Sequence, residues 1–416
     1  MCAMTRAALA VLALIGCTTE DGPPIRYGGV MVSVLRDELP VPDAAVVFHD
    51  AYGRVLGTTR TDSTGHASGE ISTWGMVTVV DPRFPQRLTT ITHVALGAAL
   101  EVPLTPVYTP APQVGTLAIA APATSPPAET FQYSIQTPCA SDGALTLPAT
   151  IPLYEGCAPE FPVLITARTQ NQNLEDPGRA LAYVAGQAID GTFQPGAWST
   201  QCKQIAVATE LSMSLQLWPR LDNYVFRYVD LGFCPASPSM LPSLDFAEGG
   251  VAYAFGYVQG APLRTASLLR DLATVPASLE LPRTELLIGD VELTRFDGKG
   301  AVWTSDPALA DADAVDAKLT WSPSAGTYVE WRFVLPRDAT SAPVPELPAE
   351  LRTWTTLDGA TEVILDLRYL DASWLASLQD VEAELPLMLD GARSKRGPAA
   401  GGSLRDYTEQ IHPLQQ

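Results

Sequence analysis

The sequence predicts an all-β protein built from several β-sandwich domains in tandem. The chain has 416 residues, including 36 prolines and 31 glycines, a content that favours short strands joined by turns over a helical bundle. Hydrophobic residues make up 46% and charged residues 17%, which is enough apolar material to fill buried cores. Short segments in which apolar and polar residues alternate recur along the chain, as half-buried strands require.

Residues 1–16 have the layout of a cleaved signal peptide, with Arg6 ahead of the apolar run Ala7–Ile15, which is too short to span a bilayer. The sequence Leu14-Ile15-Gly16-Cys17 resembles the lipobox of bacterial lipoproteins. The resemblance implies that Cys17 becomes the first residue and carries a diacylglyceryl group. The alternative is an ordinary signal peptide with an incidental cysteine.

Residues 17–26 are polar, contain proline and show no periodicity, so we expect them to be a tether. Thr18 stands directly after the cysteine, where an Asp would resemble an inner-membrane retention signal. In an organism with two membranes, the resemblance therefore implies an outer-membrane lipoprotein, facing either the periplasm or the surface.

Residues 27–108 are predicted to form a first β-sandwich. Val30, Val32 and Val34 alternate on one face of a strand. Turn residues follow at Pro42, Gly53, Asp62 and Gly65, and a strand follows Gly75 at Val77-Thr78-Val79. This order resembles the carboxypeptidase regulatory-like family. The resemblance implies a seven-stranded sandwich of prealbumin-like topology that acts as a spacer, a stalk or a glycan-contacting module and is not catalytic.

Residues 113–310 are expected to form a β-rich region with disulfides. Besides Cys2 and Cys17 the chain has four cysteines, an even number that in an exported protein indicates disulfides: Cys139, Cys157, Cys202 and Cys234. Three pairings are open. Cys139–Cys157 with Cys202–Cys234 is favoured because each pair closes a local loop. Asp297-Gly298 predicts a hairpin turn, and residues 267–274 predict a short helix.

Residues 311–390 predict a further β domain. Trp321-Ser322-Pro323, followed by alternation over 329–335, is similar to strands of fibronectin type III and immunoglobulin-like domains. We expect a short amphipathic helix over 371–384. Residues 391–416 are polar and rich in glycine, so they are expected to form a flexible tail.

No catalytic, cofactor or metal site is predicted. The four histidines lie in no metal-binding or nucleophile-base pattern, so structural or solvent-exposed roles are expected: His49, His66, His93 and His412. A nucleophile elbow and a phosphate-binding glycine loop are both missing from the sequence, although a Ser-His-Asp site needs no local motif.

Two sets of residues are weaker candidates for ligand sites. Four carboxylates over 306–316 could bind Ca²⁺, but the glycine and terminal Glu of such a loop are absent, so a solvated acidic loop is expected: Asp306, Asp311, Asp313 and Asp316. Exposed tryptophans could stack on sugars, although most fall at alternating strand positions where core packing is the default: Trp198, Trp218, Trp303, Trp321, Trp331, Trp354 and Trp374.

The formal net charge of −20 disfavours nucleic acid as a partner, because binding phosphate needs clustered Lys and Arg. The expected partners are the membrane, through the N-terminal lipid, and a glycan or protein ligand. Three functions were weighed: a non-catalytic lipid-anchored envelope protein with a structural, adhesion or ligand-binding role; a glycan-binding or assembly lipoprotein that serves an envelope enzyme or secretion system; and an envelope hydrolase. The first is favoured.

Overall fold

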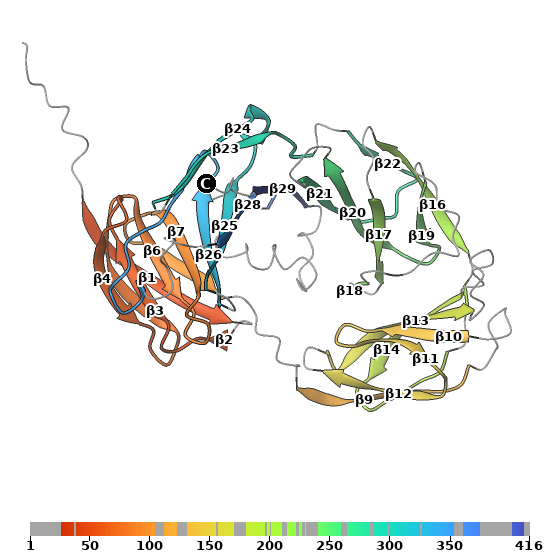
Figure 1. Ribbon diagram of the computed structural model, residues 1–416. Helices are drawn as coiled ribbons and strands as arrows, with labels where there is room; N and C mark the ends of the chain where they lie inside the picture. The colour runs from red at the N-terminus through yellow and green to blue at the C-terminus, as the bar shows by residue number, and fades with distance from the viewer. Residues whose placement is uncertain are drawn as a thin grey trace, which may run out of the picture.

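A computed structural model provides the structure of the chain. It describes residues 26–36, 39–104, 112–122, 131–154, 157–169, 180–195, 198–199, 201–209, 214–221, 224–226, 229, 240–258, 264–282, 286–297, 299–324, 327–352, 361–374 and 402–411. The described chain is all-β, with several sheets and a single turn of 3-10 helix, η2 (Pro307–Leu309). The all-β prediction is confirmed (Figure 1).

The first unit contains two sheets that pack face to face. One sheet is formed by β1 (Tyr27–Arg36), β2 (Leu39–Pro40), β5 (His66–Ser72) and β8 (Ala99–Pro103). The other contains β3 (Ala45–His49), β4 (Val55–Arg60), β6 (Gly75–Val80) and β7 (Arg87–Val94). The alternating valines of β1 point into the shared core, where Val32 and Val34 meet Val46, Phe48 and Val79. The predicted inward face of the first strand is therefore confirmed.

A second unit follows, also with two sheets around one core. The sheet order β12-β9-β15 joins β9 (Gln113–Ile119), β12 (Ala149–Tyr154) and β15 (Thr192–Phe193). The order β11-β10-β13-β14 joins β10 (Phe131–Gln136), β11 (Ser141–Leu145), β13 (Glu160–Thr169) and β14 (Ala180–Ala188). The core between them contains Leu117, Ile135, Ile151 and Phe161.

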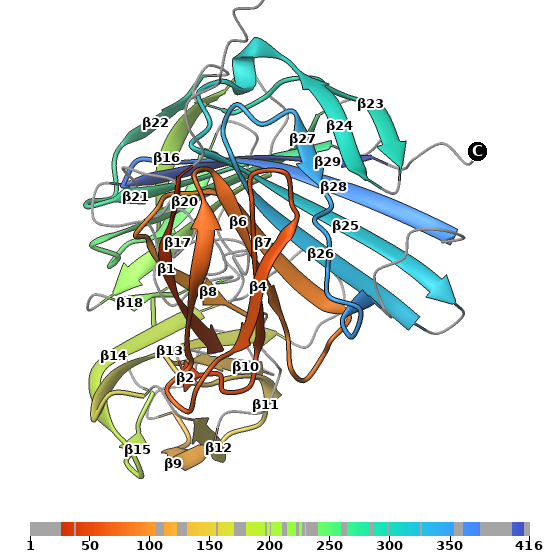
Figure 2. The same cartoon turned by 90° about the vertical axis from the view of Figure 1, so that its left-hand side faces the viewer.

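A twelve-stranded sheet joins the first unit to the later part of the chain. Its order is β18-β17-β20-β21-β29-β28-β25-β26-β7-β6-β3-β4. The later strands are β17 (Ser214–Leu221), β18 (Tyr224–Val225), β20 (Gly249–Val258), β21 (Arg264–Leu272), β25 (Ala314–Ser324), β26 (Thr327–Pro336), β28 (Thr361–Ala372) and β29 (Ser403–Ile411). Parallel pairing of β26 with β7 carries this sheet across the predicted boundaries at 108 and 310 (Figure 2).

Two small sheets cover one face of the long sheet. The first consists of β16 (Cys202–Thr209), β19 (Met240–Leu244) and β22 (Ser278–Leu281), and its core includes Ile205 and Leu217. The second consists of β23 (Val291–Asp297), β24 (Gly300–Ser305) and β27 (Ser341–Pro343), and its core includes Trp303 and Trp331. The predicted hairpin at 297–300 is confirmed by the antiparallel pairing of β23 with β24.

Two predictions of local structure are wrong. Residues 267–272 form part of β21 instead of a helix, because β20 and β29 pair with this segment on both sides. Residues 403–411, predicted as part of a flexible tail, form β29 between β21 and β28. The helix expected over 371–384 begins on residues that belong to β28 and a turn, and the rest of it lies outside the described residues.

Candidate functional site

A row of aromatic side chains follows β20 and ends on the neighbouring strand β17. Trp218 stacks on Tyr253, with ring centroids 5.0 Å apart. Tyr253 stacks on Phe255 at 6.2 Å, and Phe255 meets Tyr257 edge to face at 5.3 Å. We call these four residues the aromatic row. Burial decreases along it, from the buried Trp218 to Tyr257, which is 63% exposed.

The strand β20 places its large side chains away from its core. Its core face carries the small residues Ala252 and Ala254, which pack under the β16-β19-β22 sheet. Residues at odd positions point to the opposite face, since successive side chains of a strand alternate. Strands normally turn aromatics inward and small or polar residues outward, so this reversed pattern brings ring surface to the exterior at the Tyr257 end of the row.

Polar side chains flank the aromatic row on both neighbouring strands. Gln216 on β17 lies opposite Tyr253, and its side chain accepts a hydrogen bond of 3.3 Å from Nε1 of Trp218. Ser267 and Thr265 on β21 lie opposite Phe255 and Tyr257. Apolar ring faces next to hydroxyl and amide groups suit a ligand that is itself amphipathic, with apolar CH surfaces and many hydroxyls.

A set of ion pairs continues the same face across the next strands of the long sheet. Asp316 forms a two-point pair with Arg332, at 2.6 Å from Nε and 3.4 Å from Nη2. Two further pairs join neighbouring strands, Lys318 with Asp366 at 2.9 Å and Arg368 with Asp406. Asp406 also accepts a hydrogen bond from Ser267, next to the aromatic row. We call these ion pairs the charged row; opposite charges balance within it.

The charged row shows why Lys318 is held as a cation. Burial lowers its pKa, but the carboxylates of Asp366, Glu330 and Asp316 together outweigh burial, so that the pKa of Lys318 is raised. A lysine that acts as a base or nucleophile needs the opposite shift. The charged row therefore reads as a structural support for the sheet.

The carboxylates over 306–316, expected to form a solvated acidic loop, serve separate local structures, and the expectation is wrong for Asp316, which lies buried in β25. Asp306 caps η2 by accepting a hydrogen bond of 2.7 Å from the amide of Ala308. Asp316 is buried against Arg332. Asp313 accepts a hydrogen bond of 2.9 Å from the amide of Ala372, and burial, together with nearby Asp371, raises its pKa. Among the described residues, no three His, Cys, Asp or Glu side chains are grouped so that they could hold a metal ion.

His49 is the start of a buried chain of hydrogen bonds across four strands. Its Nε2 lies 3.0 Å from Oγ1 of Thr78, which lies 2.8 Å from Oγ1 of Thr90. Nε1 of Trp331 donates to that Thr90 oxygen at 2.8 Å. An indole can only donate, so the Thr90 hydroxyl oxygen accepts from Trp331, and the Thr78 hydroxyl links Thr90 to Nε2 of His49. This arrangement is structural: it ties β3, β6 and β7 to β26.

The other histidines are separate from each other. Nδ1 of His66 lies 2.8 Å from the hydroxyl of Ser33, and His93 is exposed at the end of β7. His412 lies outside the described residues. The described histidines thus have separate partners: His49 lies beside Thr78, His66 beside Ser33 and His93 beside Thr92.

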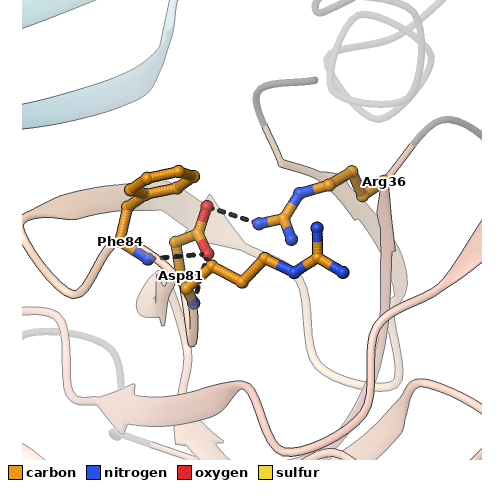
Figure 3. A network of polar contacts seen from close by, with 4 residues as sticks. Arg36, Asp81 and Phe84 are labelled. Atoms are coloured by element: carbon orange, nitrogen blue, oxygen red, sulfur yellow. Dashed lines mark hydrogen bonds and ion pairs between the residues drawn. The ribbon is translucent and has the colours of Figure 1, made fainter. Parts of the chain in front are cut away.

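A buried ion pair fixes the loop between β6 and β7. Nη2 of Arg36, at the end of β1, lies 2.5 Å from Oδ2 of Asp81. The other carboxylate oxygen accepts hydrogen bonds from the amides of Arg83 and Phe84, at 2.8 and 3.2 Å. Figure 3 shows Arg36 facing Asp81, with Phe84 beside them. The carboxylate thereby uses both oxygens to hold the loop against β1.

The cysteines follow the sequence analysis where the structure describes them. Cys139 and Cys157 form a disulfide whose Cα atoms are 5.1 Å apart, and both pack on the core of the second unit. Cys202 is also disulfide-bonded. Cys234 and Cys17 lie outside the described residues.

Most of the tryptophans singled out in the sequence fill cores. Trp303, Trp321 and Trp331 are fully buried, and Trp218 is nearly so. Trp198 and Trp374 are half-buried against cores, and Trp354 lies outside the described residues. The sequence analysis did not single out residues 253–257. The signal was the alternation of small and aromatic residues, Ala-Tyr-Ala-Phe-Gly-Tyr, over 252–257.

Comparison with known proteins adds no relative. No protein-family model matches the chain, and no curated protein is significantly similar to it. Within the described residues, no helix has the length and apolar character needed to cross a membrane.

Proposed function

We propose that this protein is a lipid-anchored component of the cell envelope with a non-catalytic ligand-binding, adhesion or structural role. The lipobox-like Leu14–Cys17 supports the anchor, and Thr18 supports the outer membrane over the inner one. The two-sheet unit that begins at Tyr27 is proposed to be a carboxypeptidase regulatory-like sandwich of prealbumin-like topology that acts as a spacer. The later β regions are proposed to be sandwich domains that carry the ligand-binding face.

The observation that carries the ligand-binding role is the reversed burial of β20. Ala252 and Ala254 are buried in the core, while on the opposite face Tyr253 and Phe255 are half-buried and Tyr257 is exposed. An exposed ring such as that of Tyr257 forgoes much of the free energy that burial of a large side chain contributes, about 1.5–3 kcal/mol. A surface of this kind is typical of interaction sites.

The chemistry of the aromatic row favours a glycan as the ligand, which supports the second function weighed above. Rings offer flat surfaces for the CH faces of sugars, and Gln216, Thr265 and Ser267 offer hydrogen-bonding groups for sugar hydroxyls. The neighbouring charged row is internally balanced, and the chain as a whole is acidic. Both features favour a neutral polysaccharide over an anionic one.

Affinity electrophoresis of the folded protein in gels containing soluble neutral glucans or mannans tests this proposal. At least one polysaccharide should retard the protein. Tyr257→Ala should weaken binding about five- to tenfold, since a ring contact of about 1 kcal/mol is lost. Tyr328→Ala is the matched control, because Tyr328 is similarly exposed but lies on β26.

The result that contradicts glycan binding is equal mobility with and without every polysaccharide tested. Equal retardation of the wild type, Tyr257→Ala and Tyr328→Ala would show that the polysaccharide binds elsewhere on the protein and that the aromatic row is not its binding site. Thermal denaturation of each variant shows whether it is folded. Tyr257 is mostly exposed, so its truncation is expected to leave stability nearly unchanged.

A further inference from the structure

The first unit has two ends of different chemical character. At one end, which we call the proximal end, lie the start of β1 and the loops at 50–54, 73–74 and 95–98. Three large aromatics are exposed there, Tyr27 at 59%, Tyr52 at 75% and Trp74 at 61%. The opposite, distal end carries the loops at 41–44, 61–65 and 81–86, with polar and charged residues such as Asp43, Asp62 and Arg83.

Trp74 is held outward by an unusual backbone conformation. Its φ is 62°, in the left-handed region that bulky residues rarely adopt. Its ring meets His93 edge to face, with centroids 6.1 Å apart, and His93 has a φ of 58°. Two non-glycine residues in this region lie side by side at an exposed end. Backbone strain that persists at an exposed aromatic points to a function for that side chain.

Hydrogen bonds join the proximal loops into one platform at the point where the chain arrives from the tether. The amide of Thr73 donates to the carbonyl of Arg26 at 2.8 Å, and the amide of Arg26 donates to Oγ1 of Thr73 at 3.3 Å. The amide of Ala51 donates to Oγ of Ser72 at 2.9 Å. The first residue that the structure describes is therefore bonded directly to the loop that carries Trp74.

The tether cannot carry the proximal end far from the lipid. Residues 17–26 include nine virtual bonds from Cys17 to Arg26, which span at most about 30 Å when fully extended. A flexible chain of this length spans about 15–18 Å on average. This distance is comparable to the headgroup and interfacial region of one leaflet together with a thin layer of water.

We propose that the proximal end lies on the membrane surface, with Trp74, Tyr27 and Tyr52 at the level of the lipid headgroups. This inference rests on the lipid anchor of the proposed function. Trp and Tyr concentrate at membrane interfaces because each has an apolar ring and a polar group. The polar groups nearby are compatible: the Arg54 guanidinium lies 5.7 Å from the Tyr52 ring, and Asp50 accepts from the amides of Tyr52 and Arg54.

In this proposal the lipid attaches the protein to the membrane, and the exposed aromatic residues of the proximal end set the orientation of the first unit. β1 has ten residues and runs from the proximal to the distal end. At about 3.3 Å per residue it places the distal end roughly 30 Å further from the membrane. The first unit thereby stands upright on the membrane, and residues 345–346, which contact Gly53, lie at the same end of the unit.

Fluorescence quenching by nitroxide-labelled lipids tests the orientation. The mature full-length protein is reconstituted in vesicles of phosphatidylethanolamine and phosphatidylglycerol, with a fluorophore on Ala95→Cys or on Ser63→Cys. Both positions are exposed, one at the proximal and one at the distal end. The Ala95 probe should be quenched at least about twofold more than the Ser63 probe, because only the proximal end reaches the interface.

Substitutions of Trp74 test its part in this contact. Trp74→Asn in the Ala95→Cys protein should lower quenching at least about twofold, and Asn tolerates the left-handed conformation, so the variant should fold. Trp74→Tyr keeps an interfacial ring and should retain the quenching. Equal quenching at the two probe positions, or no response to Trp74→Asn, overturns the inference.

Mass spectrometry of the N-terminal peptide in the same preparation separates this inference from the proposed function. A lipid-modified Cys17 with unquenched Ala95 refutes only the membrane contact of the proximal end. An unmodified N-terminus refutes the anchor itself, and with it the basis for the contact.

Discussion

Acidification is expected to destabilise this protein through His49. The imidazole is buried between β3 and its neighbours, and burial lowers its pKa to about 4 from an ordinary value of 6.5. The backbone of Gly53 and the carboxylate of Asp50 act in the opposite direction but do not outweigh burial. The folded protein therefore holds His49 neutral, with Nε2 lying 3.0 Å from the Thr78 hydroxyl oxygen.

The sign and size of the effect follow from linkage. Because the folded pKa is depressed, the unfolded chain takes up a proton first, and stability falls as the pH drops from 6.5 towards 4. A difference of about 2.5 pKa units corresponds to a loss of roughly 3 kcal/mol in the free energy of unfolding once the pH is below 4. At pH 5 the loss is about 2 kcal/mol.

Urea denaturation at pH 7, 6, 5 and 4, compared between the wild type and His49→Gln, measures this term. Gln preserves a polar group near Thr78 but does not titrate, so its free energy of unfolding should depend less on pH between 7 and 5 by about 2 kcal/mol. The difference between the two proteins removes the contribution of other titrating groups. If the free energy of unfolding of the two proteins depends on pH in the same way, His49 is not held neutral by burial and the reasoning is refuted.

Three further predictions concern the first two units. Asp81→Ala should lower the free energy of unfolding by about 3–5 kcal/mol, because it leaves the buried charge of Arg36 unpaired. The double variant Asp81→Ala/Arg36→Met should recover part of this loss. Urea titrations measure both variants, and an Asp81→Ala protein as stable as the wild type would contradict the account. Gly75→Ala should destabilise the protein by about 1–3 kcal/mol, since the new Cβ would lie 2.6 Å from a backbone oxygen. Gly57→Ala, with open space around it, should be neutral or stabilising. A higher melting temperature for Gly75→Ala than for Gly57→Ala would be inconsistent with this packing. Cys139→Ala should lower the free energy of unfolding by about 3 kcal/mol relative to the oxidised wild type, because the disulfide is lost. Calorimetry under oxidising conditions measures this loss, and the variant should be about as stable as the reduced wild type. A variant as stable as the oxidised wild type would contradict the prediction.

Local patterns in the sequence predicted the strands that have one core face. The valines of β1 and the hairpin at 297–300 carry their own signals, an alternation of period two and a turn residue pair. The segment 267–272 misled because two adjacent leucines fit a helix as well as a strand. Its state is decided by pairing with β20 and β29, and a short apolar run does not encode those partners.

Non-local pairing was the part of the fold that the sequence could not supply. β29 reads as a polar tail because Arg405 and Asp406 interrupt its apolar positions. Its neighbours in the sheet make ion pairs with both, Asp371 with Arg405 and Arg368 with Asp406. Arg405 and Asp406, whose charges favour solvent exposure in a reading of the sequence, are thus paired with residues more than thirty positions away.

The candidate site was harder to predict than the fold for a similar reason. The alternation over 252–257 is typical of a strand, but alternation does not tell which face is covered. Only the packing of the β16-β19-β22 sheet on Ala252 and Ala254 shows that the rings face outward. Conversely, Asp306, Asp313 and Asp316 are close in sequence yet serve three different local structures.

The central claim, a lipid-anchored envelope protein that displays a ligand-binding face, is tested most directly by protease shaving of intact cells with mass spectrometry of the retained N-terminus. The account predicts a diacylglyceryl-modified Cys17 at the membrane. Peptides from the region of the aromatic row should be released from intact cells if the protein is on the surface, and only after outer-membrane permeabilisation if it faces the periplasm. An unmodified N-terminus that begins at another residue would contradict the account.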